Sequence, residues 1–188
     1  MSPLWRRSLV YVRFILTICA LVYLPSRAGT REETYKMCAG ISMSGAVAYG
    51  AQDWVALSSL SRRLIVQCKG VVTDEDIASA YASLGTAQLE LGDAKSALAT
   101  SEDCVKLVYL ETACHINEVE ALVVLGRRKA AAVMLDKVDR MVEIQQKMLL
   151  AKSEAGMSEY DRKMHSARLM TLAAVAKRSE TLRQQMQP

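Results

Sequence analysis

Apolar and small residues recur every three or four positions along most of the chain, which is the spacing of one face of an α-helix. The clearest stretch of this kind covers residues 74–91. Thr73 and Asp76 form the pattern of a capped helix start, because each side chain can pair with a backbone N–H of the first turn. Gly92 ends this helix, since glycine takes left-handed backbone angles without strain, and Asp93 caps the next helix.

The polar turns divide the chain into helical hairpins. The second helix of the pair just described is expected over residues 94–108. A first hairpin is expected over residues 33–68, with its turn near residues 51–53. A third hairpin begins near Glu111 and turns at Gly126. The pattern therefore predicts three hairpins in succession.

The C-terminal part of the chain predicts two longer helices. The second helix of the third hairpin meets no helix breaker before Gly156, and Ser158 with Asp161 then starts a last helix. Pro188 is the only proline after residue 28, and aromatic residues are few, so the chain has little from which to build strands. The sequence predicts an all-α fold.

Two of the hairpins carry the same pattern at an offset of 34 residues. This period and pattern resemble the tetratricopeptide repeat. The resemblance implies a short solenoid of about three helix hairpins, with repeats at residues 37–68, 78–111 and 112–145, and a C-terminal capping pair of helices reaching residue 186. The matched positions are Ala87 with Ala121, Leu91 and Gly92 with Leu125 and Gly126, Ala97 with Ala131, and Leu107 with Met141.

A glycine in the middle of a predicted helix supports this interpretation. Gly85 costs about 1 kcal/mol in helix propensity relative to alanine. The cost is explained if a second helix crosses closely at this point, and Ala97 is expected on the other side of the crossing. Because a chain of 188 residues with about half of them apolar is expected to bury one core, residues 29–188 are expected to form a single domain.

In the family that the repeats resemble, the first helix of each hairpin lines a concave groove that holds peptides. The resemblance places such a groove here and implies that it is mostly apolar. Members that clamp a terminal carboxylate use lysine, arginine and asparagine on this face, and this chain departs from that pattern. Ala48 is expected on this face, together with the eight residues to which we assign partner binding: Ile41, Tyr49, Ala82, Thr86, Leu89, Ile116, Glu120 and Val123.

The first 28 residues have the pattern of an export signal. Arg6, Arg7 and Arg13 precede an apolar run at residues 14–24, and small residues before Gly29 suit a signal peptidase. An uncleaved membrane anchor is the alternative, although the run is shorter than the roughly 20 residues that cross a bilayer. We expect an exported protein, periplasmic or secreted, that touches a membrane only if this segment stays uncleaved.

The net charge of the chain comes from that segment. The sequence has 24 Lys and Arg and 20 Asp and Glu, and the four basic residues before residue 29 account for the whole difference of +4. The remaining residues carry 20 basic and 20 acidic side chains, so they lack the basic field that nucleic acid attracts. We expect no nucleic-acid partner.

Four cysteines remain in residues 29–188, and an even number in an exported chain favours disulfides. Three pairings are formally possible. Antiparallel helices around the turn at residues 51–53 would bring Cys38 to Cys68, and the connector between the second and third hairpins would bring Cys104 to Cys114. The alternative is four reduced cysteines that fill small core positions.

Catalytic patterns are weak. His115 and His165 stand beside no credible nucleophile in the sequence, and there is no glycine-rich phosphate loop. Cys104, Cys114 and His115 are a poor metal set, because adjacent residues on a helix point about 100° apart. We expect no enzyme, no cofactor and no metal.

Three functions fit these observations. The first is an exported module that binds a peptide or helix of an envelope or secreted protein in the apolar groove. The second is a structural subunit whose groove is filled by its own last helix and whose methionine-rich surface meets partners. The third is a binder of a lipid or small apolar ligand between helices.

Overall fold

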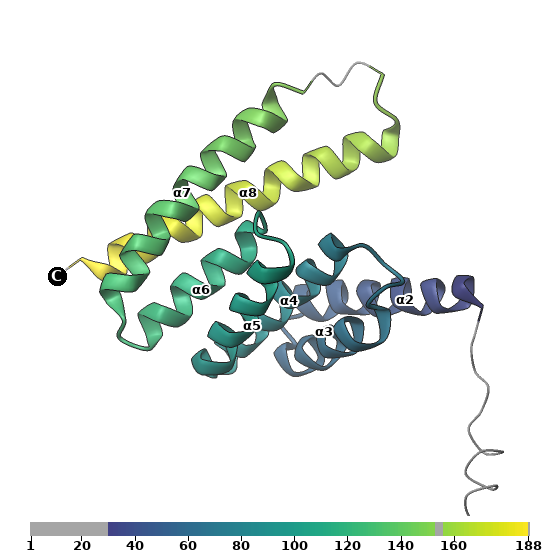
Figure 1. Cartoon of the computed structure of the whole chain (residues 1–188), viewed down its shortest axis with the longest axis horizontal. Coiled ribbons are helices and arrows are strands. Elements are labelled where there is room, and N and C mark those ends of the chain that lie inside the picture. The colour runs from purple at the N-terminus through teal and green to yellow at the C-terminus, as the bar shows by residue number, and fades with distance from the viewer. Residues whose placement is uncertain (1–29, 153–155, 188) are drawn as a thin grey trace, which may run out of the picture. The chain divides into compact units, whose positions relative to one another are not determined.

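The computed structural model describes residues 30–152 and 156–187, and the ordered elements in these ranges are helices (Figure 1). Residues 34–188 form one compact unit, which holds all seven of these helices apart from the first three residues of α2. The prediction of an all-α fold is confirmed for the described ranges. The helices are α2 (Arg31–Gly50), α3 (Trp54–Cys68), α4 (Asp74–Glu90), α5 (Ala94–Leu107), α6 (Thr112–Val124), α7 (Arg128–Leu150) and α8 (Glu159–Met186).

The helix starts follow the capping residues that the sequence indicates. Thr73 and Asp76 form a complete capping box at α4, with the Asp76 N–H donating to Thr73 Oγ1 at 3.2 Å. Asp93 accepts from the Ser96 N–H at α5, and Ser158 accepts from the Asp161 N–H at α8. These local signals fix the element boundaries because each one satisfies a backbone donor that the helix itself leaves unpaired.

Each of the first three hairpins turns in the same way. Gln52, Gly92 and Gly126 have φ values of 57°, 81° and 72°, which lie in the left-handed region. At each turn this residue donates its N–H to the carbonyl three positions back, and the next residue donates to the carbonyl five positions back. This pair of hydrogen bonds is a Schellman motif. Gln52 does in the first hairpin what glycine does in the other two.

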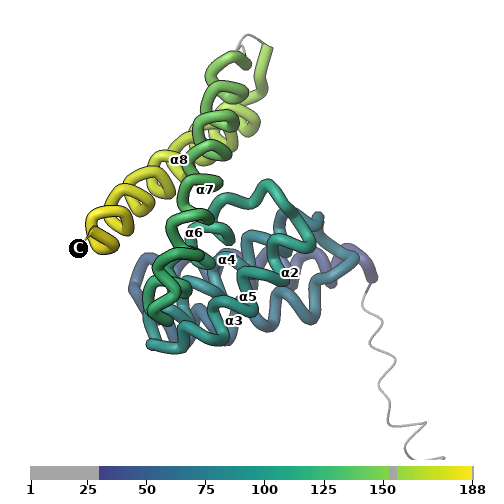
Figure 2. Tube along the Cα trace, turned by 60° about the vertical axis from the view of Figure 1, so that its left-hand side comes forward, coloured from purple at the N-terminus to yellow at the C-terminus, as the bar shows by residue number. Residues whose placement is uncertain are grey.

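Each helix packs against the helix that precedes it, and α2, α4, α6 and α8 also lie next to one another (Figure 2). The contacts of α4 with α6 and of α6 with α8 link successive hairpins. Cys38 and Ile41 of α2 share an apolar cluster with Ile77 and Ala80 of α4, which extends the same arrangement to the first hairpin. The hairpins are thus joined side by side through their first helices.

Small residues are buried where the helices come together. Ala87, Ala97, Ala121 and Ala131 are all fully buried, as their matched positions in the sequence predict. In the first hairpin the small residues Ala46 and Ala51, in contrast, are exposed. The buried residues of that hairpin nearest its turn are Ala48 and Leu57, which share a cluster with Ala87.

Gly85 lies at a close helix approach, as expected, but the neighbours differ from those predicted. A Cβ added at Gly85 would be 3.0 Å from Asn117 Nδ2 of α6 and 3.4 Å from Ser101 Oγ of α5. The tightest contact therefore comes from the next hairpin, and α5 contributes Ser101 rather than Ala97 among the three nearest atoms.

Both predicted disulfides are present. Cys38 and Cys68 join α2 to α3 with their Cα atoms 5.8 Å apart, and Cys104 and Cys114 join α5 to α6 with a Cα separation of 6.2 Å. All four cysteines are buried, and because they are bonded in pairs the alternative of reduced core thiols is wrong for this structure. Such bonds are compatible with an oxidising, exported environment.

The predicted signal segment lies outside the described residues. Among the helices of residues 30–152 and 156–187, none combines the length and the apolar character needed to cross a bilayer.

Candidate binding cleft

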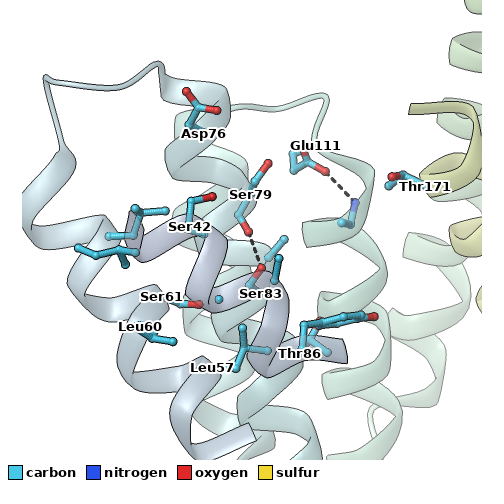
Figure 3. Close-up of a pocket in the computed structure, with 18 of the residues that line it drawn as sticks. Ser42, Leu57, Leu60, Ser61, Asp76, Ser79, Ser83, Thr86, Glu111 and Thr171 are labelled. Carbon is cyan, nitrogen blue, oxygen red and sulfur yellow. Dashed lines mark hydrogen bonds between the residues drawn. The ribbon is translucent and has the colours of Figure 1, made fainter. Parts of the chain in front are cut away.

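A cleft of about 1070 Å³ is lined by residues of α2, α3, α4, α6 and α8 (Figure 3). It lies along the first helices of successive hairpins, which is the surface that the sequence singles out for binding. Four groups of these side chains give the cleft its chemistry: one row on α2, one row on α4, two carboxylates at the start of α4 and α6, and a polar cluster where α6 meets α8.

The α4 row consists of small side chains. Ser79, Ala82, Ser83 and Thr86 line the cleft and are spaced three or four residues apart, so they share one face of the helix. Ser83 Oγ donates to the Ser79 carbonyl at 3.0 Å, and Figure 3 shows the two serines along the same side of α4. Small residues leave room for a ligand to approach the helix closely, and their hydroxyls offer hydrogen bonds.

The α2 row is uncharged and carries large side chains. No charged residue occurs in residues 37–52, and the α2 side chains of the cleft come from this uncharged stretch and from Tyr35 just ahead of it. Tyr35, Met43 and Tyr49 are 58%, 72% and 54% exposed, although they line a concavity. Exposed apolar side chains around a concave surface are typical of a binding site.

Two carboxylates stand at one end of the cleft. Asp76 lies in the first turn of α4, where its Oδ2 accepts from the N–H and the hydroxyl of Thr73. Glu111 precedes α6, and its Oε1 accepts from the Ala113 N–H at 3.3 Å. Burial raises the pKa of Glu111, and this effect outweighs the Ala113 hydrogen bond and the charges of His115 and Arg168, which lower it. Figure 3 shows Asp76 and Glu111 near the same end.

A polar cluster around Asn117 joins α4, α6 and α8. The buried Asn117 donates through Nδ2 to the Ala82 carbonyl at 2.8 Å, and its Oδ1 accepts from Thr86 Oγ1 at 3.3 Å and from Arg178 Nη1 at 3.2 Å. Arg178 also forms an ion pair with Glu120. The only arginine that lines the cleft is therefore already paired within the chain.

The cleft includes five of the eight residues that the sequence assigned to partner binding. Ile41, Tyr49, Ala82, Thr86 and Ile116 line it, although Ile41, Ala82 and Ile116 are buried and present little surface. The other three residues, Leu89, Glu120 and Val123, lie outside the lining. Glu120 is paired with Arg178, and Val123 packs against the apolar cluster that α6, α7 and α8 share.

The last helix was expected at the groove only in the structural-subunit alternative, and the sequence did not indicate which α8 residues line the cleft. Thr171, Ala174, Val175 and Arg178 line the cleft from α8, at the spacing of one helical face. The α8 helix lies beyond the matched repeats, so the repeat pattern did not place it. Asn117 was missed as well, because a single asparagine in a helix gives no periodic signal.

Among the groups considered for chemistry, His115, Cys104 and Cys114 are all fully buried. His115 is fully buried and hydrogen-bonds through Nε2 to the Tyr109 carbonyl at 2.8 Å, while its Nδ1 lies 3.6 Å from Glu118 Oε2. Cys104 and Cys114 are bonded to each other, which uses the two sulfur atoms that a metal would need. No cluster of potential metal ligands occurs among the residues that the structure describes.

Comparisons with protein families, with curated proteins and with solved structures find no match for this chain. The function is therefore argued from the cleft itself.

Proposed function

We propose that this protein is an exported interaction module of the tetratricopeptide-repeat type, and that it binds a peptide or helix of an envelope or secreted protein in the cleft. The observation that carries the proposal is the cleft: small side chains on α4 face an uncharged row of α2 whose tyrosines and methionine are exposed. Binding an apolar segment costs such a surface little desolvation free energy, because the α2 row is uncharged. Binding is favourable because it removes the exposed apolar groups from water.

The behaviour of the matched positions supports the repeat interpretation. Residues 34 positions apart adopt the same role in consecutive hairpins. Leu91 and Leu125 are helix C-caps, and the following Gly92 and Gly126 both take left-handed angles. The contacts between first helices of successive hairpins are those that a solenoid requires, since each repeat then buries its face on its neighbour.

The two disulfides and the N-terminal sequence support export. Disulfides persist mainly in oxidising compartments, and both cysteine pairs of residues 30–152 are bonded. The basic and apolar pattern of the first 28 residues provides an export signal.

The dimensions of the cleft favour a short segment as the ligand. Tyr35 and Tyr49 both line it and are separated by 14 residues of one helix, or about 21 Å. That length matches about four turns of a helix or about six residues of an extended peptide.

A matched pair of substitutions on α2 tests the proposal. Ser42 is exposed and lines the cleft, whereas Ser44 is exposed on the same helix but lies outside the lining. Ser42→Trp is expected to fill the cleft and abolish retention of partner proteins from the exported fraction of the source cells. Ser44→Trp is the control and is expected to retain them, with both variants showing wild-type helicity by circular dichroism. Equal retention by the two folded variants would place binding elsewhere.

One observation favours a second role for the last helix. Arg178 of α8 occupies the surface of α6 at Asn117 and Glu120, so part of the concave face is filled by the chain itself. In this alternative α8 closes the third hairpin and the protein acts as a structural subunit. The cleft beside α2 and α4 is not filled in this way, which is why we prefer the binding module.

A further inference from the structure

We propose that the cleft selects a segment with an uncharged, largely apolar body and a lysine or arginine at one end, held beside Asp76 and Glu111. This inference rests on the proposed function and adds the chemistry of the ligand. The three charged side chains that line the cleft are Asp76, Glu111 and Arg178. Because Arg178 is paired with Glu120, the two carboxylates leave an unbalanced negative charge.

Each carboxylate keeps an oxygen for a further donor. Both hydrogen bonds to Asp76 are accepted by Oδ2, and the bond from Ala113 is accepted by Oε1 of Glu111. Among the described residues, Oδ1 of Asp76 and Oε2 of Glu111 thus remain for a ligand. Arg168 acts on Glu111 from a distance, but its side chain lines the separate pocket between α7 and α8.

The two carboxylates lie at the same end because α4 and α6 run in the same direction. Cys114 of α6 lies beside Ala78 of α4. Asn117, three residues further along α6, contacts Ala82 and Thr86, so positions increase together along α4 and α6. The first turns of these helices therefore meet at one end, where Figure 3 shows Asp76 and Glu111.

The α2 row adds an aromatic ring at that end. Cys38 and Ile41 cluster with Ile77 and Ala80, which pairs the N-terminal half of α2 with that of α4. Tyr35 therefore belongs to the carboxylate end, and its ring is 58% exposed. The face of a tyrosine ring attracts an ammonium or guanidinium group, so it favours the same kind of ligand as the carboxylates. The remainder of the α2 and α4 rows is uncharged and suits an apolar body.

Selection from a phage-displayed library of random twelve-residue peptides tests this inference on the full exported domain. Peptides that bind the wild type and the Ser44→Trp variant but not Ser42→Trp are expected to be apolar and to carry a lysine or arginine near one end. Changing that basic residue to glutamine in the synthetic peptide is expected to weaken binding about fivefold. Asp76→Asn with Glu111→Gln is expected to give a similar loss and to remove the effect of the peptide substitution.

Glu102→Gln with Asp103→Asn is the matched control, because it removes two exposed acids of α5 that lie outside the cleft. This control is expected to leave binding within twofold of wild type, at about the scatter of such measurements. Cleft-dependent peptides without a basic residue, or an unchanged affinity after the lysine or arginine is replaced, would overturn the inference and leave the proposed function standing. If no selected peptide distinguishes Ser42→Trp from Ser44→Trp, both proposals fail.

Discussion

The two end hairpins of the molecule are held together by different means. The first hairpin, α2 with α3, has a covalent tie between Cys38 and Cys68. At the other end, α7 pairs both with α6, in the third hairpin, and with α8; we call the α7–α8 pair the last hairpin. It is held by apolar side chains and ion pairs and contains no cysteine. Both hairpins end a row of packed helices, so each has one face without a neighbouring hairpin among the described residues.

The first helix of the first hairpin, α2, buries few of its side chains. Of the 20 residues in α2, only Cys38, Ile41 and Ala48 are buried. Gly40, Gly45 and Gly50 lie within it, and a glycine in a helix interior is unfavourable by about 1 kcal/mol relative to alanine. A Cβ at Gly40 would meet no atom within 4 Å, so close packing does not explain that glycine.

The last hairpin buries more side chains and pairs its charges. Leu135, Val138 and Val142 of α7 share a cluster with Leu172, Val175 and Leu182 of α8. Arg183 bridges Asp136 and Asp139, and Ser179 donates to Asp139. These contacts hold α7 against α8 without a covalent bond between the two helices.

The two hairpins differ in how much of their surface is used for stability and how much stays exposed. A disulfide fixes α2 without using its outward surface, which leaves the uncharged row free to line the cleft. The α7–α8 hairpin gains stability by covering its apolar surface, which leaves less of that surface for a ligand. The end whose exposed α2 side chains line the cleft is thus the end with a covalent bond between its two helices.

The largest expected change in the free energy of unfolding follows from removal of the Cys38–Cys68 disulfide. Cys38→Ser with Cys68→Ser removes a bond across a sequence separation of 30, which the loop-entropy relation values at about 3.6 kcal/mol. Urea unfolding should show this loss of free energy, and amide exchange should quicken in α2 more than in α8. Unchanged protection of the α2 amides would break the comparison, because α2 would then be held by packing alone.

The next effect concerns the apolar cluster of the last hairpin. Leu135 is fully buried, and Leu135→Ala is expected to lower the free energy of unfolding by about 3 kcal/mol, through lost burial and the cavity left behind. Exposed Val133→Ala on the same helix is the control and should change stability by less than about 0.5 kcal/mol. Similar losses for the two variants would show that the α7–α8 cluster is not what holds this end.

The smallest effect is expected at the ion pairs. Arg183 is about half exposed in its pairs with Asp136 and Asp139, so solvent screens these interactions. Arg183→Ala should cost no more than about 1 kcal/mol, and the cost should shrink at high salt in thermal unfolding experiments. A loss as large as that of Leu135→Ala would mean that charge, rather than apolar burial, secures the last hairpin.

Local features of the fold were predictable from the sequence. Capping residues such as Thr73 and Asp93, and turn residues such as Gly92 and Gly126, act within a few positions of themselves. The disulfide pairs followed once the turns were placed, because antiparallel helices bring residues at similar distances from a turn together.

Contacts between helices that are far apart in the sequence were harder to predict. Arg178 meets Asn117 and Glu120 across 61 and 58 positions, and no spacing rule connects residues so far apart. The repeat pattern therefore placed Glu120 on an open face, whereas α8 covers it. Five of the eight assigned residues nevertheless line the cleft, because parts of the periodic faces of α2, α4 and α6 follow the helix repeat.

The amide of Asn117 has a consequence for how the cleft keeps its width. One planar group reaches the backbone of α4 with its nitrogen and receives the side chains of α4 and α8 with its oxygen. Leucine fills a similar volume and aspartate offers the oxygens, but neither can give and receive at once. The distances between α4, α6 and α8 at this point are accordingly set by the hydrogen bonds of a single side chain.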